Sequence, residues 1–180
     1  MISHHKLYVG IDVHRLEHKV AVIPADVLGK TGETWKWSSR LTIRNNKSDF
    51  EHLNTTIKSY ISNPDEVIIA VDFTGGHYSE PLIYYLQREG YTVCHLEPKA
   101  TKAARERLLD EENKSDDIDC AYFAYLLYLK DVHGTSFRIS ALRPELGSKA
   151  AVMRSLMLQR QQFVKLTTQF TNRLHQFLLV

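Results

Sequence analysis

The chain has 180 residues, of which 43% are apolar and 24% are charged, a composition that excludes disordered and collagen-like proteins. No uninterrupted apolar run approaches the roughly 18 residues of a membrane span, and the N-terminus leads into a strand-like segment, so we expect a cytosolic protein. Cys94 and Cys120 lie in apolar surroundings without metal-ligand spacing and are expected to be buried, reduced thiols.

Basic side chains are concentrated in the C-terminal part of the chain. Residues 143–180 hold six Lys or Arg against one acidic residue, whereas residues 1–142 hold 17 basic and 20 acidic residues. A basic helix indicates a polyanionic partner, although a solvated helix face explains the same charges about equally well.

The first third of the chain predicts three strands and a helix. Apolar runs at Leu7–Val13 and His18–Ile23 predict a hairpin, and the alternation over Thr34–Arg44 predicts a third strand. Ser48, followed three residues later by Glu51, is interpreted as a capping box that opens a helix reaching about Ser62.

Strands and helices then alternate. The continuous apolar run Glu66–Asp72 predicts a strand buried in the middle of a sheet. It is followed by a helix closed at Gly90, a strand over Thr92–Leu96, a basic helix from Pro98 and a last helix over Ser115–Lys130. This order predicts an α/β fold with a mixed sheet, an antiparallel hairpin at one edge and flanking helices, which is the ribonuclease H-like order.

Residues 143–180 predict a long helix that begins a second segment. A large apolar residue recurs every seven positions, at Leu156, Phe163, Phe170 and Phe177. Val152 and Leu166 lie on a companion seam. This repeat favours a coiled coil or a helical hairpin, through which we expect homo-oligomers. Because the helix pattern runs to the last residue, we expect the sequence to be a fragment of a longer protein.

Four aspartates stand where this sheet order would gather them. Asp12 lies near the end of the first strand, Asp72 ends the central strand, and Asp116 and Asp119 share one face of the first turn of the last body helix. Each has a structural explanation: the helix acids suit a helix N-terminus, and Asp72 could cap the following turn.

Taken together, the four carboxylates predict a metal site. An oxygen-only ligand set suits Mg²⁺ or Mn²⁺, as one or two ions, and does not suit zinc. Two such ions about 4 Å apart can clamp the attacking and leaving oxygens of a phosphodiester. We therefore expect phosphoryl transfer on a nucleic acid.

Three sequence blocks carry a resemblance to a known family. They are Gly10–Val13 with Lys19–Val22, then Val71–Tyr78, then Lys114–Ala121. In this order they resemble the motifs of the DEDD transposases, which are RuvC-like insertion-sequence recombinases related to the Piv DNA invertases. The Arg-rich segment 154–178 is similar to the coiled-coil segment of that family.

The resemblance implies a DNA transposase or recombinase that cleaves and exchanges strands with Asp12, Asp72, Asp116 and Asp119 as metal ligands. Its domains would be a RuvC-like nuclease over 1–142 and the start of a helical coiled-coil segment over 143–180. It also implies a nucleophilic serine in a further C-terminal domain, a possible bridge RNA as guide, and association with the nucleoid. One departure is that the family usually has Glu where this chain has the shorter Asp72.

Several basic residues are candidates for nucleic-acid contacts, and each is equally explained as a solvated side chain: Lys99, Lys102, Arg105, Lys114, Arg154, Arg160 and Arg173. Two other functions compete with recombination. A non-catalytic nucleic-acid-binding or dimerisation module would make the acids structural. An actin-like or sugar-kinase-like phosphotransferase ranks lower, because Val13 and His14 replace the glycine that such proteins need after the first aspartate.

Overall fold

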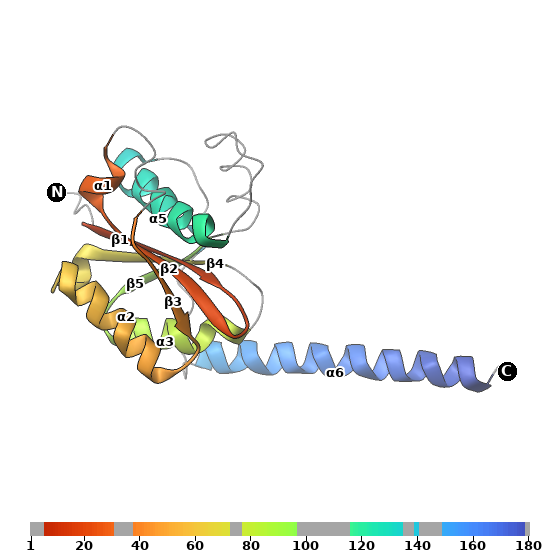
Figure 1. Cartoon of the computed structure of the whole chain (residues 1–180). Helices are drawn as coiled ribbons and strands as arrows, with labels where there is room; N and C mark the ends of the chain where they lie inside the picture. The colour runs from red at the N-terminus through yellow and green to blue at the C-terminus, as the bar shows by residue number, and fades with distance from the viewer. Residues whose placement is uncertain are drawn as a thin grey trace. The chain divides into compact units, whose positions relative to one another are not determined.

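The computed structural model describes residues 6–30, 38–72, 77–96, 116–134, 139–140 and 149–178. The chain divides into two compact units, Met1–Leu142 and Arg143–Val180. The first unit is a sheet with helices on both faces (Figure 1). Its strands and helices are β1 (Leu7–Val13), β2 (Glu17–Pro24), α1 (Ala25–Leu28), β3 (Arg40–Arg44), α2 (Lys47–Tyr60), β4 (Val67–Asp72), α3 (Glu80–Arg88), β5 (Thr92–Leu96), α5 (Asp116–His133) and β6 (Ile139–Ser140), with short 3₁₀ turns at Pro64–Glu66 and His77–Ser79.

The described strands form one mixed sheet in the order β3-β2-β1-β4-β5-β6. β1, β4 and β5 are parallel neighbours, whereas β2, β3 and β6 pair antiparallel. The predicted α/β class, the hairpin edge and the central position of β4 are therefore confirmed. β6 was not predicted, because two residues carry no readable alternation.

Two apolar layers hold this sheet between its helices. On one face, Val9, Ile11 and Ile69 pack with buried side chains of α2 and α3. On the other, Tyr8, Ala21 and Ala70 pack with α5, which lies across the sheet in Figure 1. Because successive strand residues point to opposite faces, every second residue of β1, β2 and β4 faces α5.

Two local predictions were wrong. The N-cap of α2 is Asn46, whose side chain accepts a hydrogen bond from the Asp49 amide, and Ser48 is already inside the helix. Asp49 in turn accepts from the Arg44 amide at 2.7 Å, so Asn46 and Asp49 together satisfy two backbone donors, and this outcompetes the Ser48–Glu51 pair. The third strand begins only at Arg40, and residues 34–37 lie outside the described residues.

The other elements agree closely with the expectations. β5 has the expected bounds, α3 follows Ser79 and is closed by Gly90 at φ 91°, and α5 runs three residues beyond Lys130. Cys94 and Cys120 are buried and free, as predicted. The basic helix expected from Pro98 lies outside the described residues.

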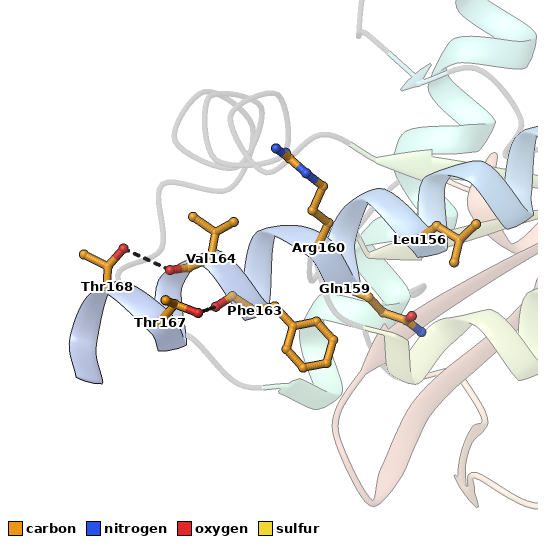
Figure 2. A pocket seen from close by; sticks show the side chains of 7 residues that line it. All are labelled: Leu156, Gln159, Arg160, Phe163, Val164, Thr167 and Thr168. Carbon is orange, nitrogen blue, oxygen red and sulfur yellow. Dashed lines mark hydrogen bonds between the residues drawn. The ribbon is translucent and has the colours of Figure 1, made fainter. Parts of the chain in front are cut away.

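The second unit contains α6 (Lys149–Leu178), a helix of 30 residues. The predicted helix is thus present, but its pairing in a coiled coil stays a prediction. The phenyl groups of its seven-residue repeat are highly exposed: Phe163, Phe170 and Phe177 have exposed fractions of 70%, 66% and 86%. A shallow pocket lies on this helix (Figure 2), lined by Leu156, Gln159, Arg160, Phe163, Val164, Thr167 and Thr168.

In the part of the chain that the structure describes, no helix is long and apolar enough to cross a membrane.

Candidate active site

Asp12 and Asp72 lie at the C-terminal ends of two neighbouring strands. β1 and β4 are parallel, and Ile11 lies opposite Val71 in their register, so each aspartate comes one residue after this pair. Asp12 comes two residues after Gly10, and Asp72 comes two residues after Ala70. Because residues two apart in a strand share a face, both aspartates lie on the face that α5 covers. Asp12 is buried and Asp72 is half-buried. The structure therefore gathers two of the four predicted acids by strand register alone.

Gly10 determines how closely α5 approaches these strands. A Cβ at Gly10 would overlap the carbonyl oxygen of Cys120 and lie 2.7 Å from the backbone nitrogen of Ala124. Its lateral neighbours in the sheet are Ala21 and Ala70, so a row of small residues receives the helix. The helix backbone thus rests directly on the strand, two residues before Asp12.

This close contact brings the third acid to the same region. Asp119 immediately precedes Cys120 in α5 and is buried, with an exposed fraction of 6%. Asp116 is the first residue of α5, one turn earlier, and its side chain lies outside the described residues. Since the backbone of α5 touches Gly10, the first turns of the helix lie beside the end of β1.

A complete metal cluster is not formed by the side chains that the structure describes. Among them, no group of three His, Cys, Asp or Glu residues is arranged to hold an ion. The assignment of the four aspartates as ligands accordingly stays a prediction, supported by the placement of their backbone positions.

His14 is a site residue that the sequence analysis did not single out. Its Nε2 lies 3.2 Å from Oδ2 of Asp12, while its backbone amide donates to the Glu17 carbonyl and closes the β1–β2 turn. The imidazole ring of His14 is therefore a direct neighbour of the Asp12 carboxylate. The signal available in the sequence was a histidine two residues after a strand-end aspartate.

The predicted nucleic-acid contacts are mostly untested by the structure. Lys99, Lys102, Arg105 and Lys114 lie outside the described residues, as does the side chain of Arg154. Arg160 and Arg173 are exposed on α6. Their role stays a prediction.

The sequence was compared with models of known protein families. A family model described as Transposase, that of the IS110-type DEDD transposases, matches residues 9–180. The chain belongs to the DEDD transposase family. The match begins within β1 and extends through α6, so it includes both units, and it confirms the resemblance drawn from the three motif blocks. A comparison with curated proteins finds no match.

Membership of this family indicates a transposase-type function in DNA recombination, and it implies DNA as a partner. The four aspartates therefore belong to a protein whose family acts on DNA.

Proposed function

We propose that residues 1–142 form a ribonuclease H-like, metal-dependent strand-cleaving domain of this transposase. Asp12, Asp72, Asp116 and Asp119 would hold one or two Mg²⁺ or Mn²⁺ ions. The observation that carries the proposal is the Ile11–Val71 register, which puts two acids side by side on the sheet face where α5 packs.

The chemistry of the donor set fits a hard divalent cation. Carboxylate oxygens are the ligands that Mg²⁺ and Mn²⁺ prefer, and no sulfur or imidazole group is needed. Asp12 and Asp119 have exposed fractions of 7% and 6%, so their charges are removed from much of the solvent. A buried carboxylate is stabilised by a cation that binds it.

The residues of the chain would position the DNA and hold the acids in place. When bound, the ions would supply charge stabilisation for the attacking and leaving oxygens of the phosphodiester. His14 would fix the Asp12 carboxylate through Oδ2, and the close packing at Gly10 would fix α5. The N-terminus of α5, which carries Asp116, favours negative charge through its helix dipole.

Further parts of the mechanism follow from the family resemblance. A serine from a C-terminal domain would complete strand exchange, which could lead to insertion, excision or inversion, and a bridge RNA could select the target. α6 would join copies of the protein through Phe163 and Phe170, with Arg160 and Arg173 contacting DNA. The shorter Asp72 keeps the non-catalytic DNA-binding module as a second candidate.

Cleavage by the full-length protein tests the proposal. Supercoiled DNA carrying the insertion element would be incubated with and without Mg²⁺, using wild type, Asp12→Asn and the control Asp26→Asn. Asp26 is an exposed acid of α1 that pairs with Lys30 at 3.9 Å, so this variant loses one charge outside the site. We expect cleavage to require Mg²⁺ and to be lost only in Asp12→Asn. Full cleavage by Asp12→Asn would favour the non-catalytic module.

A further inference from the structure

A row of paired residues crosses the sheet beside the two acids. Lys19 of β2 lies opposite Asp12 of β1, and Thr42 of β3 lies opposite Lys19. Directly paired residues of antiparallel strands share a face. Lys19 and Thr42 therefore lie on the same face as Asp12, the face on which α5 packs.

The same face of β3 carries two arginines. Arg40 pairs with Ala21, and Arg44 pairs with Glu17. Leu41 and Ile43, which alternate with these arginines along β3, pack into the apolar layer on the opposite face. Thr42 and Arg44 are exposed and Arg40 is half-buried. Lys19, Arg40, Thr42 and Arg44 are called the basic edge below.

Lys19 is held in place above the two strands. Its Nζ donates to Oγ1 of Thr42 at 2.9 Å and lies 3.4 Å from Oε1 of Glu17, and a quarter of its side chain is exposed. The ammonium group is thus directed towards β3, away from the neighbouring Asp12, although the carboxylate stands opposite it in the register. The basic edge carries three cations, Lys19, Arg40 and Arg44. The acids beside them include Glu17, the cross-strand neighbour Asp12, and Asp49, which accepts from the Arg44 amide.

We propose that the basic edge binds the phosphates of the DNA strand on one side of the cleavage position. This inference rests on the proposed function, because it takes the acids as the cleavage position. Neighbouring strands are about 4.8 Å apart, so β3 lies roughly 10 Å from β1. A strand with one phosphate at Asp12 and Asp72 and its backbone running across β1, β2 and β3 brings its next phosphates over Lys19 and Arg44.

Edge strands also carry cations for another reason, which is protection against pairing with other sheets. β3 is the edge strand of the described sheet, so this explanation must be separated from DNA binding. The two explanations differ in one measurable quantity. Each phosphate contact contributes about 0.7 to 0.9 to the slope of log K against log salt, and edge protection contributes nothing.

The experiment measures binding of the full chain to fluorescein-labelled single-stranded and duplex DNA by anisotropy, at several salt concentrations between about 50 and 200 mM. The variants are Lys19→Gln, Arg44→Gln and Lys19→Arg, with Lys47→Gln as the matched control. Lys47 is an exposed lysine of α2 that pairs with Glu51 at 3.6 Å, on a helix that packs against the opposite sheet face.

We expect Lys19→Gln and Arg44→Gln each to lower the salt slope by about 0.7 to 0.9, while Lys19→Arg and Lys47→Gln keep the wild-type slope. Thermal melting of each variant checks that the sheet is intact. Wild-type slopes in both Gln variants would overturn the basic edge as a phosphate site and leave the metal site standing. If the wild-type chain did not bind DNA, that result would contradict two statements: that the basic edge binds phosphates, and that this domain binds DNA at all.

Discussion

Replacing Gly10 by alanine should separate α5 from the sheet. The added methyl group would overlap the Cys120 carbonyl oxygen and lie 2.7 Å from the Ala124 nitrogen, well inside the roughly 3.5 Å of a comfortable contact. Both obstacles are helix backbone atoms, so no side-chain rotation relieves them. The helix must move by roughly 1 Å or the strand must distort.

The cost should lie at the upper end of overpacking effects. Inserting a methylene into a tight core costs about 1 to 3 kcal/mol, and the rigid surroundings of Gly10 favour about 3 kcal/mol. For a protein of this size, this corresponds to a fall in Tm of roughly 6 to 12 °C. The shift also moves Asp119 relative to Asp12, so metal affinity should fall with stability.

Urea unfolding of the full chain measures this effect, with Gly29→Ala as the control. A Cβ at Gly29 would meet the flexible hydroxyl end of Tyr128 at 3.0 Å, and φ at Gly29 is −81°, which alanine adopts freely. We expect the control to change the free energy of unfolding by less than about 1 kcal/mol. If Gly10→Ala were as stable as Gly29→Ala, the direct contact between α5 and β1 would be refuted.

Three further predictions concern His18, Asp72 and α6. Burial, with His14 nearby, lowers the pKa of His18, so the unfolded chain takes up this proton more readily. The free energy of unfolding should therefore fall as pH drops below about 6.5, and His18→Leu should flatten this dependence whereas the exposed control His52→Gln should not. Asp72→Glu should raise Mn²⁺ affinity or leave it unchanged in a titration, and a loss of affinity would show that the site is built around the shorter side chain. Changing Phe163 and Phe170 to serine should lower the oligomer mass in sedimentation without changing the melting of the sheet, and an unchanged mass would reject that helix face as an interface.

The parts of the fold that sequence predicted best are those with strong local patterns. The Val67–Val71 run was readable as a central strand because its residues are buried on both faces, and β5 was bounded by Gly90 before it and the end of its apolar run. The start of α2 was misplaced because two capping pairs, Asn46–Asp49 and Ser48–Glu51, compete within six residues. Only the hydrogen bonds of Asn46 and Asp49 show which pair forms.

The candidate site was predictable in its acids and not in its surroundings. Asp12 and Asp72 stand at strand ends, and the alternation of strands and helices indicates that these ends meet. The contact of Gly10 with Cys120 joins residues 110 positions apart, and no local pattern signals it. The same is true of the row from Asp12 to Thr42, which depends on the registers of two antiparallel pairs.

Mn²⁺ binding to the full chain tests the central claim most directly. Bound ions would be counted by calorimetry and electron paramagnetic resonance in wild type, in Asp12→Asn, Asp72→Asn and Asp119→Asn, and in the control Asp26→Asn. The account predicts one or two ions per chain, a wild-type melting temperature raised by Mn²⁺, and an affinity at least about tenfold weaker in each of the three site variants but unchanged in the control. Equal Mn²⁺ affinity in wild type and all three site variants would contradict a metal site at the end of β1 and β4.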